Sequence, residues 1–183
     1  MIHFPEPYAD AVSRLRVPAG FLLVALFAWF SDPTPASLAA GIPLSMAGLA
    51  LRAWAAGCVD KDRSLAAAGP YAYLRNPLYV GTLTVAAGLV VGSRSAGLGL
   101  LFAAVFALVY LPRIQLEEQH LRRLFPEYAD YAARVPALLP RLRPLHRVSP
   151  GAFTFARYLH NREYQAGAGF AVGVLFLLWK AFH

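Results

Sequence analysis

The residues best suited to chemistry lie in one stretch, residues 69–81, which reads Gly-Pro-Tyr-Ala-Tyr-Leu-Arg-Asn-Pro-Leu-Tyr-Val-Gly. It places two prolines, three tyrosines and one arginine between two long apolar segments. The fork of an arginine can bind a carboxylate through two hydrogen bonds, and the face of a tyrosine attracts a cation. Rigid and polar residues in such a place indicate a binding site.

The prolines predict the conformation of this stretch. Pro70 and Pro77 fix φ, remove amide donors and move the residue before each of them away from helical geometry. Pro77 also suits the first turn of a following helix. We therefore expect a stiff, non-helical loop at a membrane surface, which ends at a helix N-terminus beside Arg75, Asn76 and Tyr79.

A second polar segment follows Pro112 and contains Glu117 and Glu118. The apolar residues there recur at helical spacing, which predicts that a membrane helix continues out of the bilayer with one apolar face. Pro126 breaks this helix, and residues 127–131 form a further short helix. The two carboxylates could bind an ammonium group, or they could lie on a solvated face and pair with nearby arginines. The apolar face is Leu116, Leu121, Leu124 and Phe125.

The composition is that of an integral membrane protein. Of the 183 residues, 58% are hydrophobic and 15% charged, whereas soluble domains have about 45–50% and about 25%. We predict an all-α membrane bundle in one domain, residues 1–183, with about five transmembrane helices and cytoplasmic loops that bind the ligand. The expected spans are about residues 17–30, 35–57, 77–92, 97–112 and 165–182.

Two details of the spans predict packing. The short connection at residues 93–95 requires an antiparallel helical hairpin. Gly88 and Gly92 stand four residues apart, which permits close approach of a neighbouring helix.

Arg52 lies inside the second span. Its favoured interpretation is a side chain that reaches the membrane interface, with a functional role as the alternative.

The basic residues predict the orientation. With the N-terminus inside, 15 of the 17 lysines and arginines lie on the inner side, and only Arg94 and Lys180 lie outside. This agrees with the positive-inside rule. Both polar stretches, residues 60–77 and 113–163, then face the cytoplasm. We expect a bacterial inner-membrane protein with a cytoplasmic N-terminus and a site open to cytoplasmic metabolites.

Other classes of function are disfavoured. The net charge of +7 is expected to set topology and to contact anionic lipid head groups rather than nucleic acid. A single cysteine, Cys58, excludes an internal disulfide and a cysteine zinc cluster. The five histidines show no metal-ligand spacing, so we predict no metal site. No signal peptide is evident, and the first span is expected to stay in the mature protein. The oligomeric state is open.

Several linked motifs resemble the isoprenylcysteine carboxyl methyltransferase family of integral membrane enzymes, to which phospholipid N-methyltransferases are related. The resemblance covers about residues 57–140, and the segment at 165–182 lies outside it. This chain departs from the family at two positions, where it has Asn76 and Arg63 and the family usually has histidine. The motifs are Gly69-Pro-Tyr71, Arg75-x-Pro77-x-Tyr79-x-Gly81, Glu117-Glu118-x-x-Leu121-x-x-x-Phe125-x-x-Tyr128-x-x-Tyr131, Val135-Pro136 and Pro140.

The resemblance implies a cofactor, S-adenosylmethionine, with S-adenosylhomocysteine as its product, and a lipid-like substrate that enters from the bilayer. It assigns catalytic roles to Arg75 and Glu118. Tyr128 and Tyr131 are interpreted as packing or interface aromatics. The cofactor-binding residues implied are Gly69, Pro70, Tyr71, Arg75, Asn76, Pro77, Tyr79, Gly81, Glu117 and Glu118.

The residue types suit this cofactor. Arginine binds its carboxylate, glutamate its ammonium, and tyrosine its sulfonium or adenine. Methyl transfer depends mainly on alignment and desolvation. A carboxylate acceptor needs no base, whereas a phospholipid amine must first lose a proton, for which Glu117, Glu118 or a lipid phosphate could serve. The alternative from another class is a non-enzymatic transporter subunit or scaffold.

Overall fold

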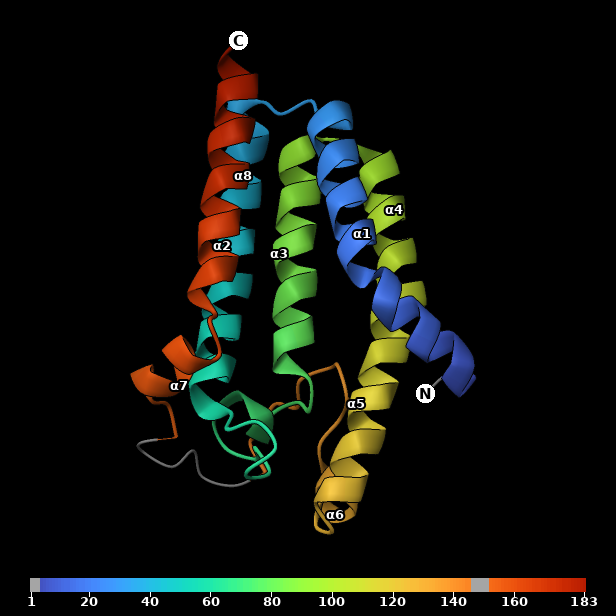
Figure 1. Cartoon of the computed structure of the whole chain (residues 1–183). Coiled ribbons are helices and arrows are strands. Elements are labelled where there is room, and N and C mark those ends of the chain that lie inside the picture. Colours follow the sequence, from blue (N-terminus) through green and yellow to red (C-terminus); the bar gives the residue numbers. More distant parts are fainter. Residues whose placement is uncertain (1–3, 146–151) are drawn as a thin grey trace. The chain divides into compact units, whose positions relative to one another are not determined.

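The computed structural model describes residues 4–145 and 152–183, and every regular element in these ranges is a helix (Figure 1). This confirms the predicted all-α membrane bundle. The elements are α1 (Glu6–Phe30), α2 (Pro35–Cys58), the 3₁₀ helix η1 (Gly69–Ala72), α3 (Pro77–Ser93), α4 (Ala96–Val105), the π-helix η2 (Phe106–Tyr110), α5 (Leu111–Leu124), α6 (Tyr128–Arg134), α7 (Phe155–His160) and α8 (Tyr164–Phe182).

Three helices are long and apolar enough to cross a membrane: Pro35–Cys58, Ala96–Leu124 and Tyr164–Phe182. The other two predicted spans correspond to shorter apolar helices, Gly20–Phe30 and Pro77–Ser93. The first of these is the end of α1, which begins at Glu6 and so includes most of the polar segment that precedes the predicted span.

The fourth apolar segment continues as a helix from Ala96 to Leu124, as predicted. A π-helical turn, η2, interrupts it and was not predicted. Burial on α5 does not follow its predicted apolar face, because Leu124 is 41% exposed while Glu118 is 7% exposed. Burial depends on which neighbours the helix meets, and residue spacing alone does not specify them.

The described residues form two units. The first contains residues 4–45, 86–119 and 172–183. Here Gln115 exchanges two hydrogen bonds with the backbone of Phe4 (2.7 and 2.8 Å). The ammonium of Lys180 donates to the carbonyl oxygens of Ala28 (3.0 Å) and Trp29 (3.3 Å), near the C-terminal end of α1. A cation is favourable there because helix C-termini carry partial negative charge.

Glycines bring α2 and α3 close together in the first unit. A Cβ built on Gly88 would lie 2.5 Å from the carbonyl oxygen of Gly41 and 2.5 Å from the amide nitrogen of Ser45. Real side chains do not approach backbone atoms so closely, so only glycine fits. The predicted close helix contact at Gly88 is therefore confirmed.

The second unit contains residues 46–85, 120–145 and 152–171. Its core is Tyr128, Tyr131 and Val135, each at most 4% exposed. Leu121 and Phe125 pack against this cluster. The short helix after Pro126 was predicted and is observed as α6. This unit also holds the whole of residues 69–81.

Candidate functional site

The loop at residues 69–81 is partly helical. The prediction of a non-helical loop is wrong over Gly69–Ala72, which forms the 3₁₀ helix η1. The carbonyl oxygen of Pro70 accepts hydrogen bonds from the amides of Tyr73 (3.0 Å) and Leu74 (3.2 Å). Proline fits the first turn of such a helix because its missing amide would have no partner there. The proline that was expected to prevent a helix therefore begins one.

Gly69 occupies a position that only glycine suits. Its φ is +61°, in the left-handed region that residues with a side chain rarely adopt. A Cβ there would also lie 2.6 Å from the Sγ of Cys58 and 3.3 Å from the Nε1 of Trp54. The loop thus begins in contact with the end of α2. Cys58 is half-buried at this contact.

Asn76 and Pro77 begin α3, as the sequence predicted. The carbonyl oxygen of Asn76 accepts from the amides of Tyr79 (3.1 Å) and Val80 (3.1 Å). The side-chain nitrogen Nδ2 of Asn76 donates to the carbonyl oxygen of Ala137 (3.2 Å). The Asn76 side chain is buried, with the residue 7% exposed. Asn76 therefore joins the start of α3 to the segment that follows α6.

Residues 131–145, which are the last turn of α6 and the segment after it, form several hydrogen bonds with the loop. These bonds hold the loop at and before Arg75, and the bond from Asn76 to Ala137 holds it after Arg75. Together they fix the backbone from which the guanidinium extends. The bonds run from the amide of Arg75 to Pro136 O (2.9 Å), from the amide of Arg141 to Tyr73 O (3.0 Å), from the amide of Leu145 to Ala72 O (2.9 Å) and from the hydroxyl of Tyr131 to Tyr71 O (2.8 Å).

The two tyrosines of α6 hold the segment in place. Tyr128 is 1% exposed and Tyr131 is 4% exposed, and their rings meet edge to face at 5.9 Å. This confirms that both are packing residues. Tyr131 does more than pack, because its hydroxyl donates to the carbonyl of the predicted site residue Tyr71, which is itself 7% exposed.

The remaining predicted site residues lie as follows. Arg75 and Tyr79 are partly buried, and the Nε of Arg75 is inside the protein. Gly81 faces α2, where an added Cβ would lie 2.5 Å from the Cγ of Arg52 and 2.8 Å from the carbonyl oxygen of Gly48. Gly81 thus permits a close helix contact, which accounts for a glycine at this position without a ligand.

Glu117 and Glu118 lie on α5 in the first unit, whereas the loop lies in the second. Glu118 is 7% exposed and Glu117 is partly buried, so the alternative of a fully solvated face is wrong for Glu118. The loop and the segment after α6 are brought together by the structure. That the two carboxylates share a site with them stays a prediction.

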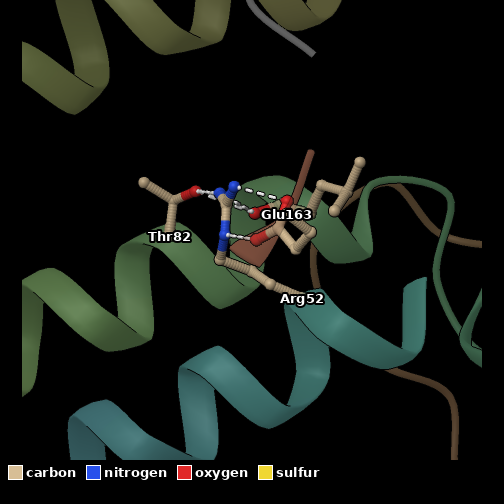
Figure 2. Close-up of polar contacts among 4 residues, drawn as sticks. Arg52, Thr82 and Glu163 are labelled. Atoms are coloured by element: carbon tan, nitrogen blue, oxygen red, sulfur yellow. Dashed lines mark hydrogen bonds and ion pairs between the residues drawn. The ribbon is translucent and has the colours of Figure 1, made fainter. Parts of the chain in front are cut away.

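Sequence reasoning missed a cluster around Arg52 (Figure 2). Its guanidinium forms a two-bond ion pair with Glu163, from Nε to Oε1 (2.5 Å) and from Nη2 to Oε2 (3.0 Å). It also donates to the hydroxyl of Thr82. The favoured interpretation of Arg52 as an interfacial side chain did not include a partner. An arginine within an apolar span usually requires one, and this was the available signal.

No group of three or more histidine, cysteine, aspartate or glutamate side chains that could hold a metal ion occurs in residues 4–145 and 152–183.

The sequence profile of the phospholipid methyltransferase family matches residues 38–128 of this chain. The nickel-cobalt-cadmium resistance protein NccN of Alcaligenes xylosoxydans xylosoxydans is 38% identical over 151 residues, which cover 75% of this chain and 70% of the relative. The cobalt-zinc-cadmium resistance protein CzcN of Cupriavidus metallidurans is 38% identical over 107 residues, 55% of this chain and 50% of the relative.

A third relative is the protein-S-isoprenylcysteine O-methyltransferase of Schizosaccharomyces pombe, 30% identical over 141 residues. The match covers 74% of this chain and 59% of that enzyme. The chain therefore spans half to about two thirds of the length of these relatives. No solved structure matches the chain.

The helices define an all-α integral membrane protein, and the anchored loop at residues 69–81 is its candidate site. The chain belongs to the phospholipid methyltransferase family, the isoprenylcysteine methyltransferase-like group. The resemblance inferred from the motifs is thus confirmed.

Proposed function

We propose that the protein is a membrane methyltransferase that uses S-adenosylmethionine and methylates a lipophilic acceptor. The observation that carries this proposal is the anchoring of the loop around Arg75. The amide of Arg75 is bonded to Pro136 O and the side chain of Asn76 to Ala137 O. An arginine on a fixed backbone can hold a carboxylate in one orientation, as a transfer reaction requires.

The residues present fit the cofactor. Arg75 offers a fork for its carboxylate, and Tyr71 and Tyr79 offer aromatic faces. The N-terminus of α3 at Pro77 favours negative charge nearby. Glu118, which is 7% exposed, is assigned to its ammonium because a carboxylate can form a charge-assisted hydrogen bond with that group.

When bound, the cofactor supplies the methyl group: its S–CH₃ bond breaks as an O–CH₃ or N–CH₃ bond forms, and the sulfur leaves as a neutral thioether. Arg75 and the tyrosines would orient the reactants and exclude water. A carboxylate acceptor becomes an ester with no proton to remove. A phospholipid amine releases one proton, for which Glu118 or Glu117 would be the base.

The acceptor class can be tested directly. Membranes that contain the protein are incubated with S-adenosylmethionine labelled in its methyl group, and the lipid-soluble label is then treated with base. A carboxyl methyl ester releases labelled methanol, whereas a methylated amine retains the label. Membranes with the Arg75→Ala variant are the control. The proposal would be contradicted if neither the released methanol nor the base-resistant lipid carried more label than in this control.

The isoprenylcysteine methyltransferase relative favours a lipid-linked carboxylate, and the family profile keeps the phospholipid amine as the alternative. We also propose that the site faces the cytoplasm of a bacterial inner membrane, supported by the 15 of 17 basic residues on one predicted side. Labelling of single introduced cysteines at Arg143 and Arg94 from either side of the membrane tests this orientation.

The names of two relatives favour a second candidate, a non-enzymatic component of a metal-resistance system. A growth test distinguishes it from the enzyme. Cells that depend on the chain for tolerance to cobalt or cadmium are complemented with the wild type or with Arg75→Ala. Full complementation by Arg75→Ala, at equal protein level, would favour the non-enzymatic role, and loss of complementation would favour the methyltransferase.

A further inference from the structure

Arg52 connects three parts of the second unit that are distant in sequence. Its guanidinium binds both carboxylate oxygens of Glu163, which is 111 residues further along the chain. Its Nη1 donates to the hydroxyl of Thr82 and to the carbonyl oxygen of Leu78 (3.4 Å), both on α3. The hydroxyl of Thr82 in turn donates to Leu78 O (2.9 Å). Figure 2 shows the guanidinium between Thr82 and Glu163.

The carbon chain of Arg52 also contacts α3. Its Cγ would lie only 2.5 Å from a Cβ added at Gly81, so the arginine side chain packs directly against this glycine. Arg52 therefore holds the part of α3 that contains Leu78, Gly81 and Thr82. This is the helix that begins at Pro77, immediately after Arg75.

Glu163 is itself held on α2. Two residues before it, the Nδ2 of Asn161 donates to the carbonyl oxygens of Ala56 (2.9 Å) and Val59 (3.1 Å) at the C-terminal end of α2. Arg162, between them, has φ +53°, a conformation that costs energy for a residue with a side chain. The turn is thus fixed at both ends, and the Glu163 side chain is 10% exposed. An exposed ion pair on a mobile side chain would have neither the anchored turn nor the buried carboxylate.

The burial and the geometry of the ion pair make it stronger than a pair exposed to water. The Arg52 side chain is 22% exposed, so the charges are largely shielded from water. Pairs of this kind, with two parallel bonds, fix geometry as well as charge. Exposed pairs contribute little by comparison. The exposed Arg94–Asp32 pair in the first unit, at 3.8 Å, is such a case.

We propose that Arg52 and Glu163 are positioning residues of the methyl-transfer site, a role that rests on the proposed function. The pair sets the position of the first turns of α3, and hence of Arg75, Asn76 and Tyr79 next to it. Through Glu163 the segment before α8 supports the cofactor site, although it lies outside the residues matched by the family profile.

The test uses the full-length protein in detergent and S-adenosylhomocysteine as the probe. The variants are Arg52→Gln, Glu163→Gln and the double variant, with Asp32→Asn as the matched control that breaks the exposed pair. Calorimetry gives the dissociation constant, and hydrogen–deuterium exchange reports the amides of residues 74–82. We expect each single variant to weaken binding at least tenfold and to speed exchange in 74–82 alone, with the control unchanged.

Because the two residues act as a unit, the double variant should bind S-adenosylhomocysteine no more weakly than the single variant with the lower affinity. If the wild type binds and all variants bind equally, the positioning role is wrong while the proposed function stands. If exchange rises throughout the protein in the variants, the pair only supports the fold, and the positioning role is again wrong. If the wild type does not bind, the proposed function fails, and the positioning role fails with it.

Discussion

The backbone amide of Arg75 donates a 2.9 Å hydrogen bond to the carbonyl oxygen of Pro136. Each residue belongs to a different motif of the sequence, one before α3 and one after α6. The bond therefore joins the two motifs into one local structure, without any contribution from the side chain of Arg75. The bond uses only the backbone of Arg75, so a substitution of the side chain leaves it in place.

The first prediction concerns this guanidinium. Arg75→Ala should weaken S-adenosylhomocysteine binding by more than tenfold, because it removes a charge-assisted contact of about 1.5–3 kcal/mol. The backbone bond to Pro136 remains, so the loop should keep its structure. Calorimetric titration checks this, with the exposed Arg143→Ala as the control. Unchanged affinity in a folded Arg75→Ala protein would remove Arg75 from the site.

The second prediction compares two charged residues of α5, one buried and one exposed. Glu118 is 7% exposed, whereas Arg122 is exposed and lies over the ring of Tyr128 at 5.7 Å. Glu118→Gln should reduce turnover because it removes the charge assigned to the cofactor ammonium. Arg122→Gln should leave turnover unchanged. Initial rates of methyl transfer check both, and equal effects would show that the segment is only structural.

Much of the fold was predictable because apolar segments bounded by proline and glycine define membrane helices. α2 begins at Pro35 and α3 at Pro77, as expected. The 3₁₀ turn at Pro70 was not predicted, because proline can either end a helix or begin one. Only the surrounding hydrogen bonds decide between these outcomes. The π-helical turn at Phe106–Tyr110 has no signal in the composition of its segment.

The candidate site was predictable in part. The motifs identified the loop and the segment after α6, and the structure brings Arg75 and Asn76 into contact with that segment. The partner of Arg52 was not predictable, because an ion pair between residues 111 positions apart depends on the tertiary arrangement. The same reason applies to Tyr131, whose burial was expected but whose bond to Tyr71 was not.

The third prediction uses two glycines in different surroundings. Gly81→Ala should destabilise the protein by about 1–3 kcal/mol, because its Cβ would meet Arg52 Cγ at 2.5 Å and Gly48 O at 2.8 Å. Gly173→Ala should be neutral or stabilising by up to about 1 kcal/mol, because nothing lies within 4 Å and alanine favours helix. Thermal unfolding in detergent compares them, and equal midpoints would contradict the close contact.

The fourth prediction tests the bond between α6 and the loop. Tyr131→Phe keeps the packing but removes the hydroxyl that donates to Tyr71 O. The loss should cost about 1–3 kcal/mol, because the carbonyl is left buried without this donor. Tyr164→Phe, on an exposed tyrosine, is the control and should change stability by less than about 0.5 kcal/mol. A Tyr131→Phe protein as stable as the control would show that packing alone holds the segment.

The most direct test of the proposed activity is calorimetric titration of the detergent-purified protein with S-adenosylhomocysteine. The account predicts binding in the micromolar range, which would establish the cofactor and leave the lipid acceptor to be found. No binding at millimolar ligand, by a protein whose helical content shows that it is folded, would contradict the methyltransferase proposal and favour a non-enzymatic role in the membrane.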